Sequence, residues 1–199
     1  MGNYKESIAI IIPALDPDER MVSLVGQLHD DGFSNIILVD DGSLIANRKY
    51  FKTCKETCHC KIIRHVVNFG KGIALKSAFN YILEQRPDIK GAVTVDCDGQ
   101  HVLPDINTCA KLTYEHPDSL ILGCRQFDDR EIPLRSRFGN KLTRQMIRLL
   151  CGIHVSDTQT GLRGLPTPLI REHFANVKGE RFEYEMNMLI AAKEYQIPI

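Results

Sequence analysis

The chain has 199 residues, of which 43% are hydrophobic and 25% are charged, a composition typical of one soluble globular domain. Its 25 basic and 25 acidic residues leave no net charge. This balance argues against a protein that coats nucleic acid, because such proteins carry a basic excess. A chain of this length also buries enough apolar surface to fold without disulfides or a structural metal.

Apolar runs of strand length alternate with amphipathic segments. The first run, Ile8–Ile12, is β-branched throughout, which is typical of a strand buried on both faces. Further strands are expected over 35–39, 61–65, 91–95 and 119–122, and helices around 21–28, 74–83, 137–150 and after 182. This alternation predicts an α/β fold with a mostly parallel sheet covered by helices on both faces. Ligands bind such sheets at the carboxyl ends of the strands.

Polar residues follow the first two predicted strands. The first strand leads into Pro13, Ala14, Leu15 and Asp16, and a capping carboxylate followed by proline predicts that Asp16 begins the next helix. The second strand leads into Asp40-Asp41-Gly42-Ser43. Burying two carboxylates at the end of a strand costs free energy unless something binds them, which favours a ligand site. The alternative is a simple turn, because Asp-Gly-Ser is common in turns.

The third strand leads into Asn68-Phe69-Gly70-Lys71-Gly72, which opens a helix. Glycines beside a helix N-terminus let backbone N–H groups approach an anion, and Lys71 adds positive charge. The spacing matches neither a Walker loop nor a dinucleotide fingerprint, which argues against a P-loop enzyme and a dehydrogenase.

The fourth strand ends at Asp96-Cys97-Asp98-Gly99-Gln100. Strand side chains alternate, so Asp96 and Asp98 are expected on the same side. Carboxylate oxygens suit Mg²⁺ or Mn²⁺, which bridge protein carboxylates to phosphate oxygens. Gln100 offers a further neutral oxygen, and we therefore expect Asp96, Asp98 and Gln100 to hold a metal.

Later segments offer more candidates. Four arginines follow the fifth strand and are either phosphate clamps or solvated surface charges: Arg125, Arg130, Arg135 and Arg137. A polar, glycine-bearing segment spans 157–164. The last helix opens near Glu183 and Glu185, which are two residues apart, so at most one of them, or the turn before them, is expected to face a site.

Seven cysteines in apolar runs and one short cluster are typical of a reducing cytosol. The cluster Cys54-Cys58-His59-Cys60 has no second ligand pair for zinc, so we expect incidental cysteines. The N-terminus lacks the pattern of a signal peptide, and no segment has the length of a membrane span. The abrupt end at Ile199 indicates a truncated chain and leaves a later membrane segment open.

Together these segments, in this order and spacing, resemble the inverting family-2 glycosyltransferases, and within them the dolichyl- and polyprenyl-phosphate sugar transferases. The resemblance implies a glycosyltransferase A-type, Rossmann-like fold that binds a UDP- or GDP-sugar with Mg²⁺ or Mn²⁺. It departs at Asp16-Pro17, where the family more often has Asn-Glu, and at Gly99, where the lipid-phosphate members usually have Leu.

The resemblance also implies roles for single residues. The nucleoside pocket would be lined by Pro13, Ala14, Leu15, Asp16, Asp40 and Asp41, with Lys71 near the base or ribose. Asp96 would lie at the sugar phosphate, where Arg125 and Arg135 would also act. The donor sugar and acceptor would contact Asp157, Gln159, Thr160 and Arg163, with Asp157 as the candidate base for a hydroxyl acceptor.

We therefore expect one catalytic domain over 1–199, with a nucleotide-sugar half over about 1–125 and an acceptor half over 126–199. The preferred acceptor is a polyprenyl phosphate, which would place the enzyme at the cytoplasmic face of the membrane. A saccharide hydroxyl as acceptor, a catalytically silent sugar-nucleotide-binding scaffold, and a homo-oligomer stay open. A sugar-phosphate nucleotidyltransferase is disfavoured because the first strand is not followed by a glycine- and arginine-rich loop.

Overall fold

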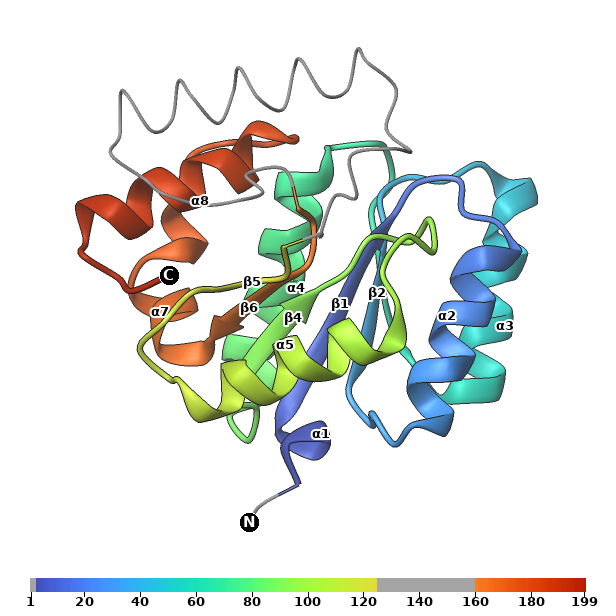
Figure 1. The fold of residues 1–199 in the computed structure, drawn as a ribbon. Coiled ribbons are helices and arrows are strands. Elements are labelled where there is room, and N and C mark those ends of the chain that lie inside the picture. Colours follow the sequence, from blue (N-terminus) through green and yellow to red (C-terminus); the bar gives the residue numbers. More distant parts are fainter. Residues whose placement is uncertain (1–2, 125–159) are drawn as a thin grey trace, which may run out of the picture.

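The computed structural model describes residues 3–124 and 160–199, where six strands form one mixed sheet in the order β3-β2-β1-β4-β6-β5 (Figure 1). Adjacent strands among β1 to β4 are parallel, whereas β6 is antiparallel to both of its neighbours. The strands are β1 (Ile8–Ala14), β2 (Ile36–Asp40), β3 (Lys61–Arg64), β4 (Gly91–Thr94), β5 (Ile121–Leu122) and β6 (Arg163–Pro166). The predicted α/β fold with a mostly parallel sheet is confirmed.

Helices cover both faces of the sheet (Figure 1). One face carries α2 (Glu19–Asp30), α3 (Arg48–Cys58) and α5 (Leu103–Glu115). The other carries α4 (Lys71–Gln85), α7 (Thr167–Glu172) and α8 (Glu183–Glu194). The short α1 (Tyr4–Ser7) precedes β1, and 3-10 turns lie at Ile45–Asn47 and Phe174–Asn176. The helix expected over 137–150 lies outside the described residues.

The central strand β1 divides two hydrophobic cores. Ile8, Ile10 and Ile12 pack with α2, α3 and α5, whereas Ala9 and Ile11 pack with α4 and α8. All seven residues of β1 are buried, as expected for a β-branched run without polar alternation. The buried strand therefore holds its carboxyl end rigidly in the middle of the sheet.

Strand β6 was not predicted. Its sequence, Arg163-Gly164-Leu165-Pro166, contains residues that are depleted in strands. It forms because it fills the space between β4 and β5, where Leu165 is fully buried. Tertiary pairing, rather than local preference, makes this segment a strand.

The start of α2 differs from the prediction. Its N-cap is Asp18, whose side chain accepts a hydrogen bond from Arg20 N at 2.9 Å, and not Asp16. Asp16 has φ of 49°, and its Oδ1 instead accepts hydrogen bonds from Leu44 N at 2.7 Å and Asn47 Nδ2 at 3.1 Å. Asp16 therefore joins the loop after β1 to the loop after β2.

Candidate functional site

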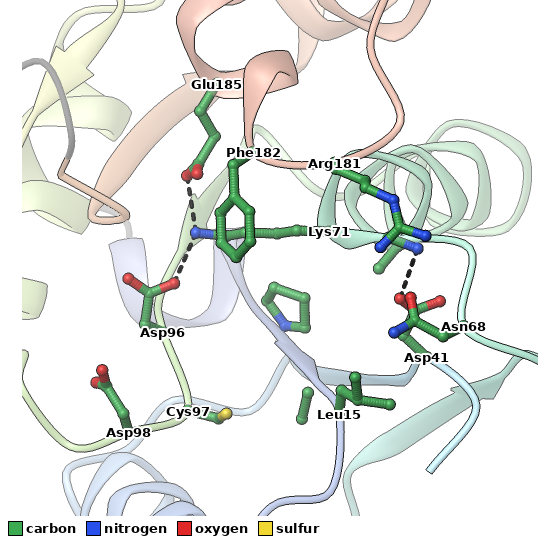
Figure 2. A pocket seen from close by; sticks show the side chains of 14 residues that line it. Leu15, Asp41, Asn68, Lys71, Asp96, Cys97, Asp98, Arg181, Phe182 and Glu185 are labelled. Atoms are coloured by element: carbon green, nitrogen blue, oxygen red, sulfur yellow. Dashed lines mark hydrogen bonds and ion pairs between the residues drawn. The ribbon is translucent and has the colours of Figure 1, made fainter. Parts of the chain in front are cut away.

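A cavity of about 400 Å³ opens at the carboxyl ends of β1, β2 and β4 (Figure 2). The chain runs outward from β1 to β3 and then returns to the other side of β1 at β4. Ligands of open α/β sheets bind at such a reversal. Residues of four chain segments line the cavity: Pro13, Ala14 and Leu15; Asp41; Asn68, Gly70, Lys71 and Ala74; Asp96, Cys97 and Asp98. Arg181, Phe182 and Glu185 complete it.

The carboxylate of Asp41 is held by the loop that opens α4. Its Oδ1 accepts hydrogen bonds from Phe69 N at 3.0 Å and lies 2.7 Å from His65 Nδ1, and its Oδ2 accepts from Gly70 N at 2.8 Å. The opposite ring nitrogen of His65 lies 2.9 Å from Ser77 Oγ. Two of the backbone donors that the sequence assigned to a bound anion therefore bind Asp41, a carboxylate of the chain itself.

Asp40, although adjacent in sequence, points away from the cavity. Its side chain is fully buried, pairs with Arg64 Nε at 2.7 Å and accepts a hydrogen bond from Ser43 N at 2.9 Å. Neither Asp40 nor Asp16 lines the cavity, so the structure does not bring them to the expected nucleoside pocket. Both stabilise the turns that present Asp41 and Leu15.

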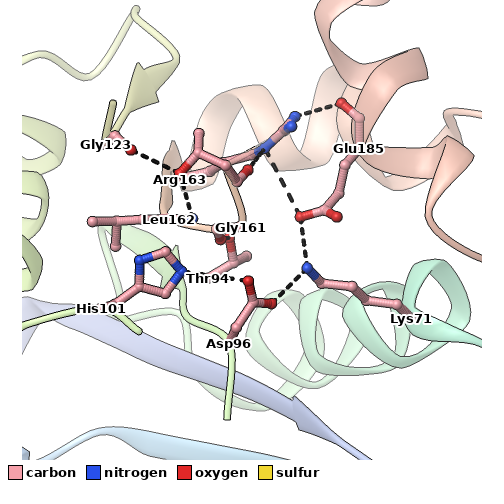
Figure 3. Close-up of polar contacts among 10 residues, drawn as sticks. Lys71, Thr94, Asp96, His101, Gly123, Gly161, Leu162, Arg163 and Glu185 are labelled. Atoms are coloured by element: carbon pink, nitrogen blue, oxygen red, sulfur yellow. Dashed lines mark hydrogen bonds and ion pairs between the residues drawn. The ribbon is translucent and has the colours of Figure 1, made fainter. Parts of the chain in front are cut away.

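A chain of charged contacts crosses the cavity from β4 to α8 (Figure 3). Lys71 Nζ lies 2.7 Å from Asp96 Oδ1 and 2.9 Å from Glu185 Oε1. Buried Arg163 supports Glu185: its Nη1 donates a hydrogen bond to the backbone oxygen of Glu185, and its Nε lies 3.9 Å from Glu185 Oε1. The cationic side chain of Lys71 therefore links the end of β4 to the beginning of α8.

These contacts shift the pKa values of both central groups. Burial alone would raise the pKa of Asp96, but hydrogen bonds from His101 and Lys71 and the charge of Lys71 outweigh it and hold that pKa well below its usual range. Burial alone would lower the pKa of Lys71, but Glu185 and Asp96 outweigh it and raise that pKa. Asp96 is therefore ionised and Lys71 protonated at neutral pH.

Two neighbours of Asp96 were missed as site residues. His101 is buried, and its Nε2 lies 3.4 Å from Asp96 Oδ2. A Cβ atom added at Gly161 would lie 2.1 Å from the same oxygen, so only glycine allows this approach. The sequence signal for Gly161 was its place in the polar segment over 157–164, and that for His101 was its position directly after Gln100.

Asp98 also lines the cavity, next to Asp96 along the same loop (Figure 2). Its Oδ1 accepts a hydrogen bond from Gln100 N at 3.0 Å. Gln100 lines a second cavity of about 220 Å³ beside His101 and α5, and its place among the predicted metal ligands stays a prediction.

The carboxylate oxygens of the cavity fit a divalent ion that is bound partly by the protein and partly by the phosphate oxygens of a ligand. Four carboxylates line the cavity (Asp41, Asp96, Asp98 and Glu185), against two cationic side chains (Lys71 and Arg181). Among residues 3–124 and 160–199, no group of three or more histidine, cysteine or acidic side chains forms an all-protein metal site. Mg²⁺ is commonly held by one or two carboxylates together with substrate phosphates, which matches Asp96 and Asp98.

The structure buries two residues that were expected at the donor sugar and acceptor. Thr160 donates a hydrogen bond to the backbone oxygen of Gly123 at 2.7 Å, and Arg163 Nε donates to the backbone oxygen of Thr160 at 3.0 Å. Neither side chain is among the residues that line the cavity; Arg163 contacts Glu185, and Thr160 joins the start of β6 to the loop after β5. The remaining candidates, Arg125, Arg130, Arg135, Arg137, Asp157 and Gln159, lie outside the described residues.

The start of α8 contributes more than predicted. Glu185 lines the cavity, whereas Glu183 Oε1 accepts hydrogen bonds from Glu180 N at 2.9 Å and Arg181 N at 3.2 Å. The prediction that at most one of the two glutamates faces a site is confirmed. Arg181 and Phe182, in the turn before the two glutamates, also line the cavity; the sequence offered this turn as an alternative but gave neither residue a role.

The thiols near these elements are poor nucleophiles. Burial and the charges of Asp98 and Asp96 raise the pKa of Cys97, which lines the cavity, to about 11. Cys54 and Cys60 pack in the core under α3, and burial raises their pKa values to about 11 and about 12. These thiols stay protonated at neutral pH.

None of the helices in the described part of the chain is long and apolar enough to cross a lipid bilayer.

Comparison with known proteins identifies relatives across nearly the whole chain. The model of the family described as Glycosyl transferase family 2 matches residues 10–174. UDP-N-acetylglucosamine--dolichyl-phosphate N-acetylglucosaminyltransferase of Methanococcus voltae is 29% identical over 96% of this chain and 82% of its own length. Human dolichyl-phosphate beta-glucosyltransferase is 24% identical over 98% of this chain and 65% of its own length.

Solved structures share the fold. Glucosyl-3-phosphoglycerate synthase from Mycobacterium tuberculosis, in complex with Mn²⁺, UDP and phosphoglyceric acid, aligns with a TM-score of 0.70 and 16% identity. The alignment covers 96% of this chain and 65% of that one. The chain therefore spans about two thirds of the length of this enzyme.

Proposed function

Because this chain belongs to glycosyl transferase family 2, we propose that its cavity binds a UDP-sugar with Mg²⁺ or Mn²⁺ and that the sugar is transferred to a polyprenyl phosphate of the dolichyl type. The observation that carries the proposal is the arrangement around β1. One side of the cavity is apolar, carries Asp41 and fits a nucleoside. The other side carries Asp96, Asp98 and Lys71 and fits a metal-bound diphosphate.

The nucleoside would lie against Pro13, Ala14 and Leu15, with Asp41 facing its polar edge. Asp41 is a preorganised acceptor because three hydrogen bonds or ion pairs already fix its position. A carboxylate held in this way accepts hydrogen bonds from ribose or base N–H and O–H groups without reorganising. The name of the relative from Methanococcus voltae contains a UDP-sugar, and the structurally similar synthase was solved with UDP, which supports UDP over GDP.

Asp98 would hold the divalent ion with Asp96, and the ion would neutralise charge on the diphosphate that leaves. Lys71 holds Asp96 in place through the 2.7 Å contact and contributes its positive charge close to the same point. We therefore assign Lys71 to the diphosphate end of the donor rather than to the base or ribose.

The acceptor needs no strong base if it is a lipid phosphate, because that group is already anionic. A phosphate oxygen of the acceptor would form a bond to the anomeric carbon of the sugar while the bond from that carbon to the diphosphate breaks. UDP would leave, and the configuration at the anomeric carbon would be inverted. Asp157, Arg125 and Arg135 remain our candidates for orienting the sugar and acceptor. The names of both curated relatives contain dolichyl phosphate, which supports this acceptor over a saccharide hydroxyl.

Donor binding tests the proposal directly. Thermal unfolding is measured with UDP, GDP and UDP-sugars, each with Mn²⁺ or with chelator. A ligand at about 100 times its dissociation constant stabilises a fold by about 2.7 kcal/mol. We expect this shift with UDP compounds and Mn²⁺, and a large loss of it in Asp98→Asn. The control is Asp118→Asn, an exposed carboxylate outside the cavity that accepts a hydrogen bond from Ser119 Oγ at 3.2 Å. No stabilisation by any nucleotide contradicts the proposal. So does stabilisation of Asp98→Asn, or of the parent chain in chelator, that equals the stabilisation of the parent chain with Mn²⁺.

A further inference from the structure

Large hydrophobic side chains that reach solvent gather at one end of the molecule. Of the eleven in the described residues, seven lie in the loops that follow β1 to β4, and Phe182 lines the cavity beside them. The loops after β2 and β3 carry four exposed aliphatic side chains: Val66 at 88%, Ile45 at 81%, Leu44 at 66% and Val67 at 53%. Single exposed aliphatic side chains are ordinary, but a cluster at one edge marks an interaction surface.

These four aliphatic side chains come from two loops that touch. A Cβ atom added at Gly42 would lie 2.3 Å from the carbonyl carbon of Val67, so the loop after β2 packs directly on the loop after β3. Leu44 and Ile45 follow Gly42 by two and three residues. The two loops therefore lie side by side, and we call their exposed aliphatic side chains the apolar patch: Leu44, Ile45, Val66 and Val67.

Positive charge flanks the patch. The 3-10 turn that contains Ile45 runs directly into α3, whose exposed side carries Arg48, Lys49, Lys52 and Lys55. With Arg64, which immediately precedes the second loop, they line a shallow groove of about 500 Å³. The only acidic residue of α3 is Glu56, 3.7 Å from Lys52, and Arg64 pairs with Asp40. The chain as a whole is neutral, so this is a local excess of cations.

We propose that the apolar patch and the basic side of α3 dock on an anionic lipid bilayer. Aliphatic side chains at loop tips enter the head-group region, and neighbouring lysines and arginines contact lipid phosphates. Nucleic acid would also attract the cations, but it offers nothing to four exposed aliphatic side chains. The patch and the cavity share the carboxyl edge of the sheet, so docking brings the cavity to the bilayer surface.

The use of this surface rests on the proposed function, because a lipid-phosphate acceptor has to be reached from the bilayer. The contact itself does not depend on catalysis. Binding to vesicles without acceptor lipid and binding of UDP in solution are therefore separate measurements. One can fail while the other succeeds.

The test is co-sedimentation of the chain with vesicles of phosphatidylcholine alone or with about 30% phosphatidylserine, at low and high salt. We expect binding to the anionic vesicles that weakens in high salt. Replacing Lys49, Lys52 and Lys55 with Ser should weaken it by about tenfold or more. Replacing Ile45 and Val66 with Ser should weaken it by a similar factor. UDP binding in solution should be unchanged in both variants.

Matched controls change the same chemistry elsewhere. Replacing Lys90, Lys111 and Lys193 with Ser removes the same charge from exposed positions outside the surface, and replacing Tyr114 and Ile199 with Ser removes exposed apolar groups. Both controls should bind vesicles like the parent chain. Absence of vesicle binding, equal loss in variants and controls, or binding to a duplex oligonucleotide but not to vesicles overturns the proposal.

Discussion

At the residue scale, the site depends on Lys71, which is almost enclosed between Asp96 and Glu185. The sequence identified Asp96, Asp98, Asp41 and the Pro13–Leu15 run as site residues, because each follows a strand end. It could not identify the partner of Lys71, since Glu185 lies 114 positions further along the chain and no spacing rule connects them. It also could not separate Asp41 from Asp40, because which carboxylate faces the cavity depends on Arg64 and the loop before α4.

Replacing Lys71 with Met should destabilise the fold strongly. The change leaves Asp96 and Glu185 without their shared cation, and breaking a buried ion pair from one side typically costs about 3–5 kcal/mol. The free energy of unfolding in urea measures it. Adding Glu185→Gln to Lys71→Met should recover part of the loss, because one uncompensated charge is removed. Lys90→Met, at an exposed position, is the control, and an equal effect there would contradict the role of Lys71.

The same network predicts a pH window. The pKa of Asp96 is depressed, so its contribution to stability is present above the ordinary value of about 3.9 and is lost as the pH falls through the folded value. The pKa of Lys71 is raised, so its contribution is present below about 10.4 and is lost as the pH rises through the folded value. In metal-free buffer, the destabilisation by Lys71→Met should therefore be constant from about pH 5 to about pH 9 and should shrink below about pH 4. A destabilisation that changes steeply near pH 7 would refute this assignment.

At the element scale, the predicted strands β1 to β5 and the helices α2 and α4 formed as expected, because their apolar periodicity is long and unambiguous. Strand β6 was missed because its four residues are unlike a strand and form one only between β4 and β5. This missed strand matters to the site. It begins at Arg163, which supports Glu185, and it follows Gly161, which packs against Asp96.

Gly161→Ala should impair the site more than the fold. The added methyl group would meet the Oδ2 atom of Asp96 at 2.1 Å, so the carboxylate must move. We expect UDP–Mn²⁺ affinity to fall by at least about tenfold, corresponding to about 1.4 kcal/mol, as measured by calorimetry. The matched control is Gly26→Ala within α2, where the added methyl meets nothing within 4 Å and should stabilise by about 0.5–1 kcal/mol. Unchanged affinity in Gly161→Ala would show that the position of Asp96 is not critical.

At the scale of the whole molecule, the strand order gathers segments that are distant in sequence. The loops after β1, β2 and β4 meet at one edge, and α8 reaches the same edge from the far end of the chain (Figure 1). The sequence predicted this edge as the binding site from strand polarity alone. It did not predict that exposed aliphatic side chains of two touching loops would lie at the same edge, or that the basic side of α3 would begin beside them, because that depends on the contact between the two loops.

The most direct test of the central claim is sugar transfer. Radiolabelled UDP-N-acetylglucosamine and UDP-glucose are each incubated with dolichyl phosphate in detergent, with Mn²⁺, and the label in the lipid phase is counted. We predict lipid-linked product from one of the donors, its loss in chelator, and a reduction of at least about 100-fold in Asp98→Asn with the fold intact. UDP binding with no transfer to lipid phosphate would contradict the account and favour a sugar-nucleotide-binding scaffold, whereas transfer only to a saccharide hydroxyl would refute the proposed acceptor.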